Sequence, residues 1–154
     1  MVRSAAGPIA MLAALLLAAT IAPHAAAQEL VKYRVVDDNA IPDPLTGAPG
    51  DPVRGQKVAV DRGLGNCLAC HAMPVNEPLQ GNIGPTLLGV GSRLTEAELR
   101  LRVVNPKILN AQTAMPAFYR IDGLYRVRKD LVGKPILSAE QVEDVVAYLK
   151  TLKE

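Results

Sequence analysis

The stretch "GNCLACHAMP", residues 65–74, contains both cysteines of this 154-residue chain. Cys67 and Cys70 are separated by two residues, and His71 follows the second cysteine directly. Three kinds of site use such a group: a redox-active disulfide, a metal site and a covalently attached haem. The remainder of the sequence discriminates among these three.

The N-terminus is typical of an exported protein. Arg3 precedes an apolar run at residues 9–22, "IAMLAALLLAATIA", and small residues follow up to Ala27. This order matches a secretory signal peptide, and the run is shorter than the roughly 20 apolar residues that span a bilayer. We therefore predict a signal peptide over residues 1–27, removed after Ala27, rather than a permanent anchor. The exported chain, residues 28–154, is expected in the periplasm without a membrane segment.

The loss of this leader weakens the alternatives to haem. Removal of residues 1–27 also removes His24, so Cys67, Cys70 and His71 provide too few ligands for a structural zinc site, which needs four. A thioredoxin-like exchange site places its cysteines in a βαβ setting, and no strand pattern is found here. Haem attachment needs two thiols that meet the vinyl groups on one porphyrin edge and an adjacent histidine for the iron, and C-x-x-C-H provides them. The sequence therefore favours one covalent haem c.

Composition agrees with this interpretation. The chain carries 17 Lys and Arg against 15 Asp and Glu, and no basic stripe dominates, so we expect no nucleic-acid partner. It has one Phe, four Tyr and no Trp. Small domains usually rely on aromatic side chains for buried area, and a haem would supply the missing apolar bulk.

Three helices are indicated by their ends. Asp51 and Pro52 are a favourable start for a helix running to about Arg62. A capping box of the form T-x-x-E opens a second helix at Thr95, which must end near Asn105 before a proline, and an S-x-x-Q box opens a third at Ser138. One face of the third helix is apolar, with Val142, Val145, Val146, Leu149 and Leu152 at helical spacing. The sequence predicts an all-α domain over residues 51–154, with three or four short helices joined by long loops that wrap a cofactor.

Residues 28–50 contain proline and glycine without helical periodicity, so we expect an extended N-terminal arm. A frayed terminus is the simpler alternative. Leu30, Tyr33, Val35 and Val36 are apolar for a tail, which favours packing against the domain or against a partner.

The second iron ligand is predicted by elimination. Met73 lies within roughly 7 Å of chain from His71, too close to return over the opposite porphyrin face. Met115, in "QTAMPAFYR", has ample reach and is the predicted distal ligand, although a lone methionine is more often a core residue. The carbonyl of Pro85 could orient the His71 ring, with Gly84 allowing close approach and Leu87 and Leu88 lining the pocket; an ordinary turn is the alternative.

The motifs "CLACH", "GP" with "LLGVGSR", and "MP" ahead of a C-terminal helix resemble class I cytochromes c. A closer resemblance, over about residues 51–152, is to the SoxX subunits of the SoxAX cytochrome complexes of sulfur-oxidising bacteria. It is carried chiefly by "GLYRVRKDLVGKPILSAEQVEDVVAYL". The resemblance implies the class I fold, haem bonded by Cys67 and Cys70, and iron held by His71 and Met115.

The same resemblance implies partners. These are a catalytic SoxA-like cytochrome, a SoxYZ carrier whose cysteine is oxidatively joined to thiosulfate, and a soluble cytochrome c that accepts the electrons. The chain itself shows no catalytic constellation, so we expect an electron-transfer subunit of an L-cysteine S-thiosulfotransferase complex. A free-standing monohaem electron shuttle and a haem-based gas sensor are the alternatives. The segment "RIDGLYRVRKDLVGK", residues 120–134, is a basic insertion. Its basic residues could face haem propionates or a partner, although a solvated loop is the simpler interpretation: Arg120, Arg126, Arg128, Lys129 and Lys134.

Overall fold

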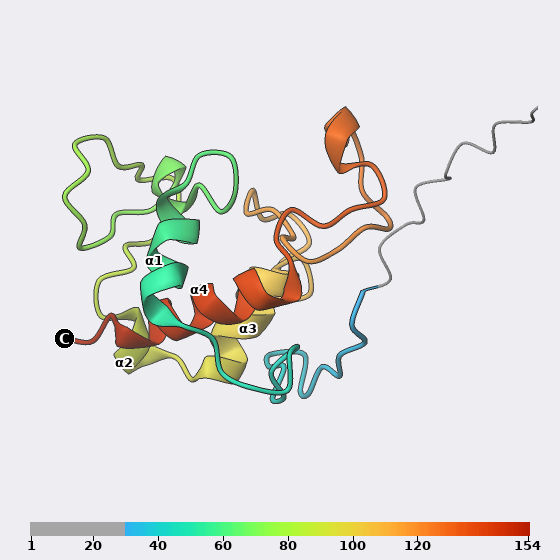
Figure 1. Ribbon diagram of the computed structural model, residues 1–154, viewed down its shortest axis with the longest axis horizontal. Helices are drawn as coiled ribbons and strands as arrows, with labels where there is room; N and C mark the ends of the chain where they lie inside the picture. The colour runs from blue at the N-terminus through green and yellow to red at the C-terminus, as the bar shows by residue number, and fades with distance from the viewer. Residues whose placement is uncertain (1–29) are drawn as a thin grey trace, which may run out of the picture.

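A computed structural model of the chain describes residues 30–154. It consists of helices and long loops around a helical core (Figure 1). The elements are α1 (Pro52–Val60), η1 (Cys67–Ala69), α2 (Val90–Arg93), α3 (Glu96–Val104), η2 (Lys129–Leu131) and α4 (Ala139–Thr151). Within residues 30–154 there is no strand, only an isolated bridge between Val36 and Ala40. The all-α prediction is confirmed, and the predicted signal peptide, residues 1–27, lies outside the described residues.

The predicted helix starts are present. The Asp51 side chain accepts hydrogen bonds from the backbone N–H groups of Val53 and Arg54 at 2.8 and 2.9 Å, with Pro52 in the first turn. The capping boxes at Thr95 and Ser138 are both complete. α1 ends at Val60 rather than at about Arg62, because the chain turns back and the Gly65 N–H donates to the Val58 carbonyl at 3.1 Å.

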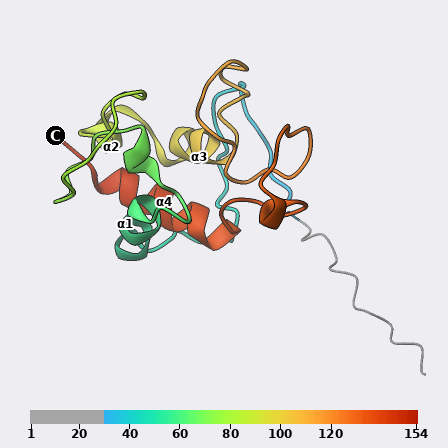
Figure 2. The ribbon, with the colours of Figure 1, turned by 90° about the horizontal axis from the view of Figure 1, so that it is seen from above.

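α1 and α3 both pack against α4, on different sides of it (Figures 1 and 2). The contact of α1 with α4 depends on Gly55, where a Cβ would collide with the carbonyl group of Asp144. The apolar face predicted for the C-terminal helix is buried, and Val142, Val145 and Val146 are at most 1% exposed. These helices form a packed platform on which the loops lie.

The segment from residue 30 to residue 50 packs on this platform (Figure 1). The Ile41 N–H donates to the Ala97 carbonyl at 3.0 Å, and the Ile41 side chain is 1% exposed. The Leu45 N–H donates to the Glu143 carboxylate at 2.9 Å. Glu143 in turn forms a fully buried ion pair with Arg100 of α3, whose guanidinium also donates to the Ile41 carbonyl at 2.8 Å. This arm is therefore tied to both α3 and α4.

No helix within residues 30–154 is long and apolar enough to cross a membrane.

Candidate functional site

The turn that carries the cysteines begins with Asn66, which has a positive φ of 47°. From there the backbone forms a helical turn in which the N–H groups of Cys70 and His71 donate to the Cys67 carbonyl at 3.1 and 2.9 Å. Residues three and four positions apart lie on the same face of such a turn. The side chains of Cys67, Cys70 and His71 therefore share one face, and both thiols are free.

The loop around Gly84 supports this turn. The Gly84 N–H donates to the Cys70 carbonyl at 2.8 Å, and a Cβ at Gly84 would collide with the His71 imidazole. His71 Nδ1 lies 2.6 Å from the Pro85 carbonyl oxygen. Because a carbonyl can only accept, Nδ1 carries the proton in this contact, and Nε2 keeps a lone pair that is free to ligate a metal.

Met115 lies in a different loop, which follows α3. The Met115 N–H donates to the Thr113 hydroxyl at 3.2 Å, and the Lys107 ammonium donates to the Thr113 carbonyl. Beyond Met115 the chain returns to α3, where the Phe118 N–H donates to the Val103 carbonyl at 3.2 Å. The loop is thus held on both sides of Met115.

Two adjoining cavities, an inner one of about 360 Å³ and an outer one of about 520 Å³, are lined by both the cysteine turn and the Met115 loop. Both are lined by Gly65, Cys67, His71, Pro85, Met115 and Phe118. The inner cavity is completed by apolar side chains of the core: Leu87, Val90, Leu94, Leu99, Val103, Leu137, Val145 and Leu149. Together they form an apolar slot lined by thiols and an imidazole from the cysteine turn and by a thioether from the Met115 loop. That donor set and lining fit a haem c, because each soft ligand type that the group needs is present.

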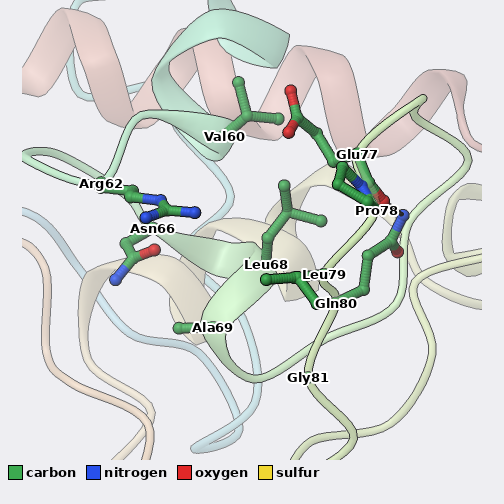
Figure 3. Close-up of a pocket in the computed structure, with 10 residues that line it drawn as sticks. All are labelled: Val60, Arg62, Asn66, Leu68, Ala69, Glu77, Pro78, Leu79, Gln80 and Gly81. Carbon is green, nitrogen blue, oxygen red and sulfur yellow. Dashed lines mark hydrogen bonds between the residues drawn. The ribbon is translucent and has the colours of Figure 1, made fainter.

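A third hollow, of about 690 Å³, lies between the end of α1, the Asn66–Ala69 turn and residues 77–81 (Figure 3). It is larger than either of these two cavities but is open to solvent, and Leu79 in its wall is 78% exposed. No cysteine, histidine or methionine lines it. It therefore lacks the chemistry of the slot.

The pKa of Cys67 disfavours a redox-active disulfide, and the placement of possible metal ligands disfavours a metal site. Burial raises the pKa of the Cys67 thiol to about 11, whereas exchange-active cysteines have lowered pKa values that make them thiolates. Within residues 30–154 no three side chains of the types His, Cys, Asp and Glu converge as a metal cluster would require.

One predicted lining residue, Leu88, occupies another position. Leu88 is 49% exposed and does not line the slot, because its side chain points to solvent where Leu87 points inward. Met73 is buried in the core at 3% exposed and does not line either cavity. Of the basic insertion, Arg128 lines the outer cavity and pairs with Asp130 at 2.7 Å, while Tyr125 is 90% exposed.

Two arginines of the inner cavity, Arg93 and Arg102, were not predicted from the sequence. Arg102 lies two residues after Arg100, and nothing in the helical pattern of α3 separates a cavity-facing arginine from a core one. Only the packing of α3 against its neighbours makes this distinction.

Comparisons with known proteins agree with one another. The family model described as Cytochrome c matches residues 52–153. The chain is 28% identical to cytochrome c2 of Rhodospirillum rubrum over 127 residues, which cover 68% of this chain and 99% of that protein. Its structure is similar to one chain of the crystal structure of SoxXA from P. pantotrophus, with a TM-score of 0.72 and 45% identity, covering 78% of this chain and 94% of that one.

Proposed function

Since the chain belongs to the cytochrome c family, as a class I member of the SoxX type, we propose that it holds one haem c through thioether bonds to Cys67 and Cys70. His71 and Met115 would be the two iron ligands. The chain is an electron-transfer cytochrome by family, and the number of haems, their attachment and these ligands are what the proposal adds.

One observation supports the proposal: Cys67 and His71 of the cysteine turn and Met115 of the loop after α3 line the same apolar slot, and Cys70 lines its outer cavity. When bound, a haem with a His/Met ligand pair supplies reversible one-electron chemistry at a comparatively high potential. The Pro85 carbonyl, 2.6 Å from His71 Nδ1, fixes the ring tautomer and its orientation. Phe118, at 6% exposed, and the leucines and valines of the inner cavity exclude water from the slot.

We further propose that the chain works as the electron-transfer subunit of a SoxAX-type complex in the periplasm. The similarity to a chain of SoxXA supports a SoxA-like partner. In such a complex the partner would couple thiosulfate oxidatively to a cysteine of a SoxYZ-like carrier, and this chain would pass the electrons to a soluble cytochrome c. The similarity to a cytochrome c2 favours a second candidate, a free-standing monohaem shuttle.

The test begins with expression of the full chain together with haem-maturation machinery. A red protein whose haem resists extraction by acid acetone is expected, and the Cys67→Ser/Cys70→Ser double variant should release or lack it. A colourless product with two alkylatable thiols would refute haem attachment.

Partner assignment needs the native periplasm. Affinity isolation of the tagged chain should recover a second, larger cytochrome in equal amount, and reduction of this chain should depend on thiosulfate and carrier. Isolation as a haem-bearing monomer that exchanges electrons with other redox proteins would favour the free-standing shuttle.

A further inference from the structure

We propose that the chain carries a site of main-chain isomerisation at Asp122–Gly123, where the aspartate converts to isoaspartate through a cyclic succinimide. The site lies in the basic insertion, residues 120–134, and uses none of the residues proposed to hold haem. The modification would occur with or without a bound haem, so it goes beyond the proposed function.

The reactive pair results from the turn in which it lies. The sequence contains one aspartate that is followed by glycine and no asparagine that is followed by glycine. A glycine is needed here, because Gly123 has a positive φ of 60° and a Cβ on it would collide with the Arg120 guanidinium. The same lack of a side chain leaves the Gly123 nitrogen open to approach by the Asp122 carboxyl group.

The backbone around the pair is not held by hydrogen bonds. Within the described residues 30–154, the main chain of residues 120–127 neither donates to nor accepts from any other backbone group. Asp122 and Gly123 are both exposed, and the segment 120–134 extends away from the helices (Figures 1 and 2). A segment with so few contacts opens at little cost in free energy. The chain can therefore reach the bent conformation that ring closure needs.

The carboxyl group of Asp122 is also free to move. Its side chain is 84% exposed and pairs only loosely with Arg120, whose Nε lies 3.9 Å from the carboxylate oxygen. That separation is longer than a hydrogen bond. No fixed contact therefore holds the carboxyl carbon away from the Gly123 nitrogen, and the two groups, being neighbours in the chain, meet at a high effective concentration.

Asp130, in the same segment, is protected at both reacting groups. Its carboxylate accepts from the Arg128 guanidinium at 2.7 and 2.9 Å. The next nitrogen along the chain, that of Leu131, donates to the Arg128 carbonyl at 2.9 Å. Ring closure at Asp130 would need these contacts to break, although its side chain is 64% exposed. Exposure alone therefore does not distinguish Asp122 from Asp130.

The reaction needs no oxidant, reductant or cofactor. The Gly123 nitrogen attacks the Asp122 carboxyl carbon, a C–N bond forms, and the carboxyl hydroxyl leaves with the amide proton as one water. Water then adds to one of the two carbonyls of the succinimide ring. Addition at the original main-chain carbonyl breaks its bond to the Gly123 nitrogen and gives isoaspartate, whereas addition at the other carbonyl restores aspartate. Isoaspartate has the mass of aspartate, but its main chain is one methylene longer.

The product changes the insertion and leaves the ligands of the slot in place. Arg128 and Leu131 of the insertion line the outer cavity, but the four residues proposed to hold haem all lie outside residues 120–134. We therefore expect the absorption spectrum of the haem-loaded protein to be retained after isomerisation.

The experiment ages haem-loaded wild type, Asp122→Asn and Asp122→Glu side by side. An isoaspartate-specific methyltransferase measures the total isoaspartate, and electron-transfer fragmentation in a mass spectrometer assigns it to a residue. Wild type should accumulate isoaspartate at Asp122, through a succinimide one water lighter, and none at Asp130. Asp122→Asn should convert several-fold faster at neutral pH, because ammonia is lost in place of water. Asp122→Glu should show none, because its extra methylene disfavours ring closure.

The synthetic peptide IDGLYR, residues 121–126, provides the rate without protection by the fold. The folded wild type should isomerise at a rate within about tenfold of the peptide, because so weakly held a segment opens easily. A slower rate in the folded chain would overturn the inference, as would equal yields of isoaspartate at Asp122 and Asp130. A wild-type protein without covalent haem would instead refute the proposed function, so the two failures are distinguishable.

Discussion

The buried ion pair between Arg100 and Glu143 should dominate the response of this fold to single substitutions. Both side chains are at most 2% exposed, and the Glu143 carboxylate accepts from Arg100 at 2.8, 2.9 and 3.1 Å and from the Leu45 N–H at 2.9 Å. Glu143→Gln keeps the shape but leaves the Arg100 charge without compensation. Removing one partner of a buried pair costs about 3–5 kcal/mol, so we expect a loss of unfolding free energy of about 3 kcal/mol.

The chain provides a control with nearly the same geometry at the surface. Arg128 and Asp130 form a two-pronged pair at 2.7 and 2.9 Å, but their side chains are 61% and 64% exposed. Asp130→Asn should therefore cost less than about 1 kcal/mol. Guanidinium unfolding of the haem-loaded proteins, followed by far-ultraviolet circular dichroism, measures both values.

Replacement of both partners provides a second check. Arg100→Met with Glu143→Leu removes the uncompensated charge and should recover most of the stability lost in Glu143→Gln. Hydrogen exchange should show the arm amides, including that of Leu45, losing protection in Glu143→Gln. Equal and small costs for Glu143→Gln and Asp130→Asn would mean that the Arg100 pair is solvated in solution, and the reasoning from burial would be refuted.

Three further predictions concern the site and its supporting helix. Met115→Ala should lose the long-wavelength sulfur-to-iron absorption band of the oxidised protein. Met73→Leu, the control, should keep that band and lower the unfolding free energy by less than about 1.5 kcal/mol. An unchanged band in Met115→Ala would show that Met115 is not the iron ligand. Gly84→Val places a side chain where the His71 imidazole lies, so the yield of haem-loaded protein, measured by absorbance per chain, should fall severely, and a normal yield would contradict the described approach. Hydrogen bonds from the Thr95 backbone and hydroxyl at the start of α3 lower the pKa of the Glu98 carboxyl, so the charged form of Glu98 stabilises the fold above its unfolded pKa, and this stabilisation is lost as pH falls through the lower folded pKa. Glu98→Gln should therefore be less stable than wild type near pH 7 and equally stable in acid. A pH-independent difference between their denaturation midpoints would contradict this prediction.

Sequence alone was sufficient where interactions are local. Helix starts at Asp51, Thr95 and Ser138 depend on side chains two or three residues from the groups they cap, so their patterns are visible in the sequence. The short α2 was not predicted as a separate helix, because it spans only Val90–Arg93 and begins after Gly89 at a positive φ of 65°. A segment of that length has no periodicity to detect.

The site residues likewise divide into those placed by the local sequence and those placed by tertiary packing. Cys67, Cys70 and His71 are neighbours in sequence, and the C-x-x-C-H spacing alone implies that they share one face of a turn. Met115 lines the same slot only through the tertiary packing of the loop after α3. The sequence did not decide whether the arm packs on the domain. The arm is held by the ion pair between Arg100 and Glu143, and these two residues lie 43 positions apart along the chain.

The arm and the haem slot are connected through α3, and this connection can be tested. Residues two positions apart on a helix point about 200° apart, so Arg100 and Arg102 leave α3 on different sides. Arg100 donates to the Ile41 carbonyl of the arm, whereas Arg102 lines the slot and also lies 3.5 Å from the side-chain oxygen of Asn39. Asn39 of the arm holds the Glu98 carboxylate at 3.1 Å, and Asn39→Ala should release it to pair with Arg102, four residues along the same helix. Ferric haem carries one more positive charge than ferrous haem, so a cation that lines the slot favours the reduced form. A carboxylate beside Arg102 would neutralise part of its charge, so the reduction potential should fall in Asn39→Ala but not when Arg102→Gln is already present. A lower potential in both backgrounds would show that Asn39 acts by another route, and no change in either would show that Glu98 stays bound in its capping box.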